Sequence, residues 1–293
     1  MNAVKELEFR ILSDNVVDSD RLVGLPGFSV FVKALHSSDE EIQILFDCSS
    51  DPEGLANNIE ALKVDLDDVD YVVISHGHWD HVAGLPYVAE QIERKVPLIC
   101  HPHALAPKLL RTKKRTQDIG IQSYFSTEMI ESLYSVITTK DPFKISNAVS
   151  TTGEIPLQTS FEKKVGKLKK AITIVDGEEV VDEILDDLSL VFRMSDDSLV
   201  LLTGCCHAGL VNTINHTVQL TGISDIRAVV GGLHLRGASQ ERLDKTCYRL
   251  KEAKIKTIAP AHCTGIKGKC LLLNRFSEEY EQVRVGTKLE FSV

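Results

Sequence analysis

Seven consecutive residues hold a dense set of metal-binding side chains, and they limit what this chain can fold into. They read Ser75-His76-Gly77-His78-Trp79-Asp80-His81. The apolar residues 71–74 before them predict a buried strand, and residues 82–92 after them predict a helix. His76 and His78, two apart on an extended turn, can point the same way, whereas Asp80 and His81 lie where the helix would begin and face a second centre. This pattern suits two adjacent metal ions, because a solvated polar turn needs no such set of ligands.

The composition is that of a globular protein acting on small molecules. Hydrophobic residues make up 43% of the 293 residues and charged residues 26%, and no stretch of about eighteen apolar residues predicts a membrane span. The first residues have neither the apolar core nor the cleavage site of a signal peptide, so we expect a cytoplasmic protein. A net charge of −9 argues against nucleic-acid binding, which needs Lys and Arg to hold phosphates. We expect a small-molecule substrate and no membrane partner, and the chain could form a homo-oligomer.

The seven cysteines predict reduced thiols. Their number is odd, and the sequence contains no Cys-x-x-Cys pair, so neither a disulfide framework nor a zinc ribbon is indicated. Three lie in apolar or helical surroundings and are expected to be small buried hydrophobic residues: Cys100, Cys247 and Cys270. Four lie next to candidate site residues, and their roles stay open: Cys48, Cys205, Cys206 and Cys263.

The histidine-rich run after a strand resembles the signature of the metallo-β-lactamase superfamily. Further matching segments are Phe46-Asp47-Cys48, Thr152-Gly153-Glu154-Ile155-Pro156, Leu202-Thr203-Gly204-Cys205-Cys206-His207-Ala208-Gly209, Val230-Gly231-Gly232-Leu233-His234-Leu235 and Pro260-Ala261-His262-Cys263-Thr264-Gly265. Together they resemble the archaeal and bacterial subfamily that includes the dihydropterin synthases of methanopterin biosynthesis. The likeness runs over about residues 8–290.

The predicted elements and the resemblance indicate one α/β domain over residues 1–293. Strands are predicted at 6–12, 28–35, 41–46, 96–100, 199–202, 228–230, 257–259 and 288–292, and helices at 50–62, 208–220 and 239–253. Because strands precede the candidate ligands each time, the site should form along one edge of two facing sheets flanked by helices. This is the four-layered αββα sandwich of the superfamily. Residues 107–150 leave the repeating pattern and are expected to form an inserted cap, and residues 161–188 to form solvated loops or hairpins.

The resemblance implies a ligand set with two departures from the common pattern. His76, His78, Asp80 and His81 are the implied ligands of the run, His262 matches the last ligand, and Asp47 is expected beneath the metal loop, where it would fix imidazole tautomers. Residues 152–156 occupy the place where many members carry a third metal-binding histidine, and none is present. His207 is the natural replacement. Cys205 falls where the common pattern has a bridging Asp, and it could bind as a thiolate.

Other residues are candidates for substrate contact and catalysis. Lys108, Arg111 and Arg115 belong to a basic run in an acidic protein, which could draw in a phosphate or carboxylate or could simply be a solvated face. Glu154 is a further candidate for substrate contact. His234 is expected to contact substrate or transfer protons, with metal binding as the alternative, and the candidate catalytic residues are Asp80 and His234.

Two further histidines lie at a strand's end. His101 and His103 sit where a substrate could reach, but we expect them to serve surface or packing roles, since nothing in the sequence marks them as ligands.

The resemblance implies an enzyme with two divalent metal ions that act as template and Lewis acid and lower the pKa of a bridging water. Zinc suits imidazole ligands, and manganese or iron would also accept this set. We expect a metal-dependent hydrolase or transferase acting on a phosphorylated or acidic small molecule, with a dihydropterin synthase as the most specific version. One alternative is an iron-dependent redox enzyme, against which the sequence shows no flavodoxin-like extension to deliver electrons. The other is a metal-binding protein without catalysis.

Overall fold

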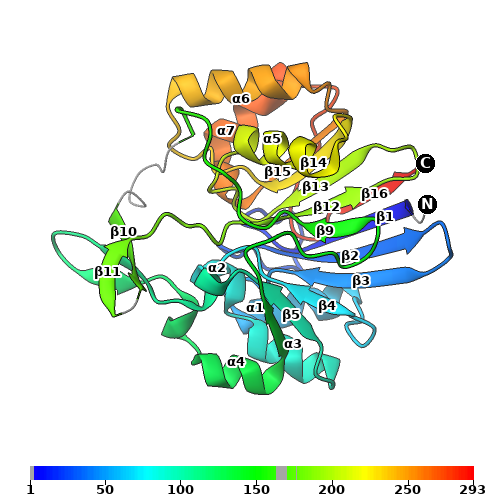
Figure 1. Cartoon of the computed structure of the whole chain (residues 1–293). Coiled ribbons are helices and arrows are strands. Elements are labelled where there is room, and N and C mark those ends of the chain that lie inside the picture. Colours follow the sequence, from blue (N-terminus) through cyan, green and yellow to red (C-terminus); the bar gives the residue numbers. More distant parts are fainter. Residues whose placement is uncertain (1–2, 163–169, 176) are drawn as a thin grey trace.

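The first large sheet is formed mainly by the N-terminal half of the chain (Figure 1). The computed structural model describes residues 3–162, 170–175 and 177–293. Seven strands pair in the order β16-β1-β2-β3-β4-β5-β8. Their bounds are β1 Val4–Ser13, β2 Ser29–His36, β3 Glu41–Phe46, β4 Tyr71–Val73, β5 Pro97–Cys100, β8 Ser135–Thr138 and β16 Lys288–Ser292. β3, β4, β5 and β8 run parallel, so their carboxyl ends meet at one edge.

The second sheet comes from the C-terminal half and faces the first. Five strands pair in the order β15-β14-β13-β12-β9. Their bounds are β9 Val149–Thr151, β12 Ser189–Arg193, β13 Leu199–Thr203, β14 Ile226–Gly232 and β15 Thr257–Ala261. β13, β14 and β15 are parallel to one another, and their carboxyl ends again lie together.

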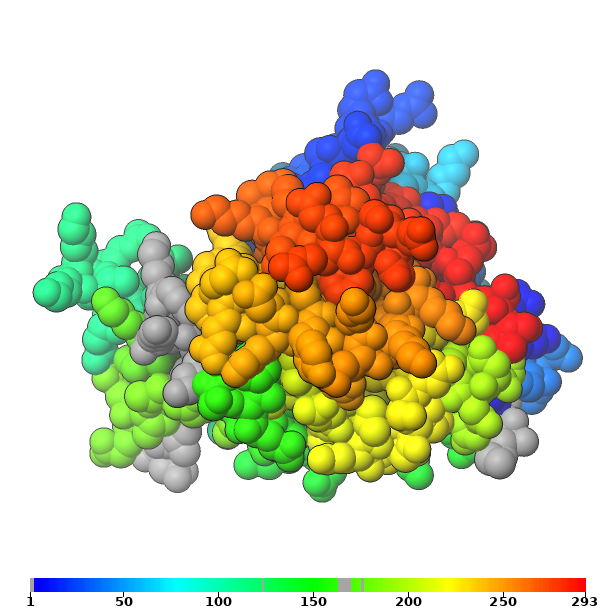
Figure 2. Space-filling view, turned by 90° about the horizontal axis from the view of Figure 1, so that it is seen from above, coloured from blue at the N-terminus to red at the C-terminus, as the bar shows by residue number. Residues whose placement is uncertain are grey.

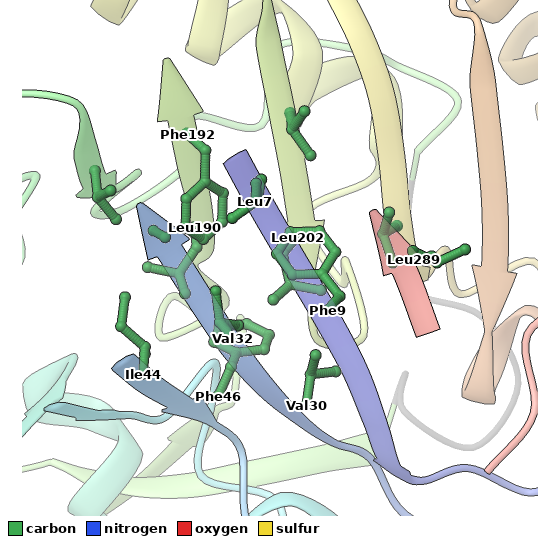
Figure 3. Close-up of a cluster of buried hydrophobic side chains, with 14 of the residues drawn as sticks. Leu7, Phe9, Val30, Val32, Ile44, Phe46, Leu190, Phe192, Leu202 and Leu289 are labelled. Carbon is green, nitrogen blue, oxygen red and sulfur yellow. The ribbon is translucent and has the colours of Figure 1, made fainter. Parts of the chain in front are cut away.

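The core between the two sheets explains why they face each other. Alternate residues of β1 and β2 point inward, and they meet side chains of β12 and β13, as Figure 3 shows. The ring centroids of Phe9 and Phe192 lie 5.4 Å apart, and both residues are fully buried. Truncating either ring to Ala would cost about 3–5 kcal/mol, the usual range for a buried aromatic side chain.

Helices cover the outer face of each sheet, which confirms the αββα order of layers. The helices against the first sheet are α1 Pro52–Leu62, α2 Trp79–Val82, α3 Leu85–Ile92 and α4 Thr127–Leu133, and those against the second are α5 Leu210–Thr221, α6 Gln240–Glu252 and α7 Gly265–Arg275. Short 3-10 helices are η1 Pro102–Leu105, η2 Ile121–Ser123 and η4 His262–Thr264. Figure 2 shows α6 and α7, in orange, covering the outer face of the C-terminal half. Among the described residues, no helix is both long and apolar enough to cross a membrane.

Two expectations about local structure need correction. The helix predicted at 82–92 starts later, as α3 at Leu85, because Pro86 has no N–H to continue the bonding of α2, which ends at Val82. Cys270 is exposed on α7 rather than buried, although Cys100 and Cys247 are buried as expected. All seven cysteines are free thiols.

The segment expected to be a cap is divided between two structures. β6 (Lys108–Arg111) and β7 (Thr116–Asp118) pair with the hairpin of β10 (Ala171–Val175) and β11 (Glu178–Val181) in a separate four-stranded sheet beside the sandwich (Figure 1). The rest of the segment, with α4 and β8, returns to the sandwich. Residues 163–169 and 176, within the stretch expected to be loops or hairpins, lie outside the described residues.

Candidate metal centre

The candidate ligands leave the carboxyl ends of four parallel strands and meet at one edge of the sandwich. The run from His76 to His81 follows β4 and enters α2. Cys205 and His207 follow β13, His234 follows β14, and His262 with Cys263 follows β15. Because β4 belongs to one sheet and the other three strands to the other, the site lies where both sheets end.

Three imidazoles form the first group of donors. His76, His78 and His207 each offer a ring nitrogen within 4.8 Å of the others, and all three residues are buried. The Nε2 atoms of His76 and His207 are 3.1 Å apart. Burial lowers the pKa of His76 and of His207 well below the usual range, and burial together with Lys108 lowers that of His78 to about 4. Neutral rings with nitrogens converging on one point are suited to bind a cation.

Asp80, His81 and His262 form the second group. Their donor atoms also lie within 4.8 Å of one another, with Asp80 Oδ2 3.4 Å from His262 Nε2. Cys205 connects the two groups, since its Sγ lies 3.3 Å from His81 Nε2 and it also falls within 4.8 Å of His76. Two cations bound to these groups would therefore be neighbours, with the Cys205 sulfur near both.

Hydrogen bonds beneath the centre select the tautomers of its histidines. The Ser75 hydroxyl donates to Asp47 Oδ2 at 2.8 Å, so it can only accept from His76 Nδ1 at 3.0 Å. His81 Nδ1 donates to Asp47 Oδ2 at 2.6 Å. His262 Nδ1 donates to Asn15 Oδ1 at 2.8 Å. In all three rings Nδ1 carries a proton, and Nε2 is the nitrogen that faces the site.

Asp47 also determines the charge of His81. Burial opposes a charged imidazole here, but Asp47 and Asp80 outweigh it and raise the pKa of His81 to about 9. Asp47 is fully buried, accepts from Ser75 N at 2.7 Å and adopts a left-handed backbone with φ 60°. A cation bound at the Asp80 group would replace the second proton of the His81 ring as the positive charge beside Asp47 and Asp80.

A buried ion cluster that sequence reasoning missed supports the metal loop from the other side. Asp186 Oδ2 accepts from Gly77 N at 2.7 Å, and Asp186 Oδ1 accepts from Lys108 Nζ at 2.8 Å. Asp187 Oδ2 accepts from Ala208 N at 2.9 Å, next to His207. The only sign of this cluster in the sequence was the adjacent pair Asp186 and Asp187 before β12. The burial of Asp186 depends on its pairing with Lys108 of the small sheet.

The basic residues expected to attract an anion do not gather at the centre. Lys108 is fully buried and paired with Asp182 and Asp186. Arg111 is exposed and forms a two-bond ion pair with Glu179, and Arg115 is exposed and donates to Gln117.

Glu154 also lies outside the pocket over the centre. It binds His101 Nε2 at 2.8 Å. His101 is buried, and its Nδ1 accepts from His103 N.

A pocket of about 550 Å³ opens over the two donor groups. One wall is largely apolar, with Trp79 from α2, Leu110 from β6 and Ile119 after β7. His234, Cys263 and Arg236 also line the pocket. Arg236 is exposed and forms no ion pair with any residue in the described ranges. Neither Cys263 nor Arg236 was assigned a role from sequence, although both stand within two residues of a candidate histidine.

The donor set fits divalent metal ions. His78 Nε2 and His262 Nε2 are buried, and each lacks a hydrogen-bond partner among the described residues. Buried ring nitrogens without partners are costly unless a ligand satisfies them. Imidazole, carboxylate and thiolate donors together match the preferences of zinc better than those of magnesium or calcium.

Comparisons with known proteins show the family and the fold. The family model of the metallo-beta-lactamase superfamily matches residues 22–156. The chain is 29% identical over 266 residues to the 7,8-dihydropterin-6-methyl-4-(beta-D-ribofuranosyl)-aminobenzene-5'-phosphate synthase of Methanocaldococcus jannaschii. The aligned residues cover 89% of this chain and 88% of the synthase. It is 30% identical over 273 residues to MJ0448, an uncharacterized protein of the same organism. That alignment covers 91% of this chain and 95% of MJ0448. Among solved structures it is similar to Tm1679, a metal-dependent hydrolase of the beta-lactamase superfamily, with a TM-score of 0.80, 25% identity and coverage of 98% of this chain and 100% of that chain.

Proposed function

Because this chain belongs to the metallo-β-lactamase superfamily, we propose that it is a metal-dependent hydrolase or transferase acting on a phosphorylated or acidic small molecule. The observation that carries this proposal is that members of both donor groups line one pocket together with Arg236, which has no ion-pair partner among the described residues. A protein that only stored metal would need neither the pocket nor the arginine.

The walls of the pocket support a substrate with a flat apolar part and an anionic part. Trp79, Leu110 and Ile119 offer an aromatic and aliphatic surface, while Arg236 offers a guanidinium that can bind a phosphate or carboxylate through two hydrogen bonds. The named relative is a synthase whose product joins a dihydropterin to a ribofuranosyl-aminobenzene phosphate. A pterin ring and a phosphate suit these two walls, so a dihydropterin synthase is the most specific form of the proposal.

The chain's own residues prepare the site for polar chemistry. Divalent metal ions bound to the two groups would supply Lewis-acid polarisation and lower the pKa of a water. Asp47 and Ser75 hold His76 and His81 in the tautomer that leaves Nε2 free, and Asn15 does the same for His262.

The remaining roles belong to the walls of the pocket. The apolar wall excludes water from one side of the substrate, and Arg236 orients its anionic group. His234 lines the pocket beside His207, where its ring can face the substrate.

The experiment combines metal depletion with a substrate screen. The purified chain would be stripped with a chelator, reloaded separately with zinc, manganese or iron, and assayed on phosphodiesters, lactones and pterin phosphates. We expect chelation to abolish turnover, reloading to restore it, and anionic substrates to be preferred. His216→Ala is a matched control, because His216 bonds the Thr152 carbonyl outside the centre. Turnover that survives complete metal removal would contradict the proposal, and product analysis would distinguish water from a second substrate as the acceptor.

A further inference from the structure

We propose that Cys205, His234 and Cys263 form a third metal position, one that takes a soft or borderline ion such as Zn(II), Co(II) or Fe(II). Their donor atoms all lie within 4.8 Å of one another. This group shares only Cys205 with the donor groups described above. The inference concerns metal stoichiometry, so it stands or falls independently of the substrate.

The chemistry of the three donors points to a metal rather than to a packing cluster. Two sulfurs and one imidazole match the Cys and His ligands that zinc and related ions prefer, and three protein ligands with an open position are typical of reactive sites. His234 Nδ1 is buried and has no hydrogen-bond partner among the described residues. Each thiol would give its proton to solvent when the ion binds, as cysteine ligands generally do.

The backbone is shaped to bring these donors together. Gly232 lies beside them, and a Cβ at that position would stand 2.8 Å from Cys263 Sγ and 3.2 Å from Cys205 Cα. A side chain at position 232 would therefore push the two cysteines out of place. His234 adopts a left-handed backbone with φ 43°, which a residue other than glycine adopts only when its surroundings hold it there.

Hydrogen bonds fix the two loops against each other. Cys263 Sγ donates to the Cys205 carbonyl at 3.3 Å. The loop that carries His234 is tied to the loop that carries Cys263, because Leu233 N donates to Thr264 Oγ1 at 3.1 Å and Arg236 N donates to the Cys263 carbonyl at 3.3 Å. The donors are thus preorganised before any ion arrives.

The position is open to the pocket and adjoins the first donor group. Cys205, His234 and Cys263 all line the 550 Å³ pocket, and Cys263 and His234 are partly exposed. The rings of His234 and His207 are 4.4 Å apart. An ion held here would share the Cys205 sulfur with the neighbouring groups and face the same substrate.

Cobalt titration of the reduced, metal-free protein tests the proposal. Wild type, Cys263→Ser and His234→Ala would be loaded with Co(II), freed of excess ion by gel filtration and analysed for cobalt content and for thiolate-to-cobalt charge-transfer absorption. We expect each variant to bind about one equivalent less than wild type and the double variant to lose no more than either alone, because both residues serve one ion. Cys206→Ser is the matched control, since Cys206 is buried, contacts Thr213 Oγ1 and lies outside the group.

Alkylation provides a second readout that needs no variant to fold. Iodoacetamide labelling of the wild-type chain, with and without Co(II), would be followed by mass spectrometry of each cysteine. We expect Co(II) to protect Cys263 and to leave the exposed Cys270 unaffected. The third position would be overturned if Cys263→Ser kept its full cobalt content and unchanged absorption. It would also be overturned if Cys263 of the wild type were labelled equally with and without cobalt.

Discussion

The two halves of the molecule deliver their metal donors in different ways. The N-terminal half places four of them in six residues after β4, so their relative positions are set by one short loop. The C-terminal half places its donors singly or in pairs after β13, β14 and β15, so their meeting depends on the register of three parallel strands. Both departures from the family pattern, the missing histidine at 152–156 and Cys205, belong to the five-stranded sheet. A change at one strand end therefore moves one or two donors, whereas a shift of the loop after β4 moves four.

The supports of the two halves differ in the same way. His76 and His81 share one support, the Asp47–Ser75 pair. His262 has its own support in Asn15, and His207 stands beside a loop held by Asp187. Loss of the Asp47–Ser75 pair should therefore affect both donor groups, whereas loss of Asn15 should affect only the group of Asp80, His81 and His262.

The largest effect is expected in the N-terminal loop. His76→Ala or Asp80→Ala should reduce turnover at least about 100-fold and lower the metal content, because each removes a donor while the packing of the sandwich is untouched. Metal analysis and steady-state kinetics would measure both. Either variant with full metal content and normal turnover would refute the loop's assignment.

His207→Ala and His234→Ala sharpen the comparison within the C-terminal half. His207 faces His76 across 3.1 Å, whereas His234 belongs to the sulfur-containing group. We expect His207→Ala to lose an ion of the His76 group, and its turnover to fall about 10-fold or more below that of His234→Ala. The reverse order of metal loss would exchange their roles.

Removal of charge at the pocket should have a smaller effect, on substrate binding. Arg236→Ala should raise KM for an anionic substrate about 10-fold with little change in kcat, as expected for a group that binds ground state and transition state alike. Arg111→Ala is the matched control, because Arg111 already pairs with Glu179 away from the pocket. If Arg111→Ala raised KM and Arg236→Ala did not, the anion would bind at the small sheet instead.

The smallest expected effects concern helix capping, and they too differ between the halves. Asp51 caps α1 locally through Gly54 N, and Asp51→Ala should cost about 1 kcal/mol. Glu162 caps α5 from a distant segment by accepting from Val211 N and Asn212 N, and it is buried. Glu162→Ala should cost about 2–3 kcal/mol, since two buried donors lose their partner. Urea unfolding would compare the two, and a larger loss for Asp51→Ala would contradict this ranking.

The Glu162 carboxyl also predicts a pH dependence. Burial raises its pKa above the ordinary value of 4.5, so the folded state holds the proton more tightly than the unfolded state. Wild type should therefore lose stability relative to Glu162→Gln as the pH rises from 4.5 through the folded pKa. Thermal unfolding of both proteins across that range would show it. A constant difference would mean that the carboxyl keeps its ordinary pKa.

The sequence predicted the parts of the site that are local. β3 begins and ends at the predicted residues, and the histidine-rich run follows a strand and enters a helix as expected. The αββα order of layers is confirmed. Neighbouring residues determine the strand and the loop, through alternating burial and the positions of donors along one segment, whereas the order of layers was implied by the family resemblance.

The unpredicted parts depend on pairing between distant segments. Lys108 is buried because β6 pairs with β10 and brings it to Asp186, a contact across 78 positions that no local pattern reveals. Arg236 and Cys263 line the same pocket because β14 and β15 pair and their carboxyl ends lie side by side. Residues 152–156 lie in none of the donor groups found among the described residues, and the acid among them, Glu154, bonds His101.

Anomalous diffraction from crystals grown with zinc would test most directly that both halves converge on one centre. We expect one zinc about 2.0–2.2 Å from nitrogens of His76, His78 and His207, and a neighbouring zinc within ligand distance of Asp80, His81 and His262. Zinc bound only by the residues of the N-terminal loop, with His207 and His262 turned away from it, would contradict the account.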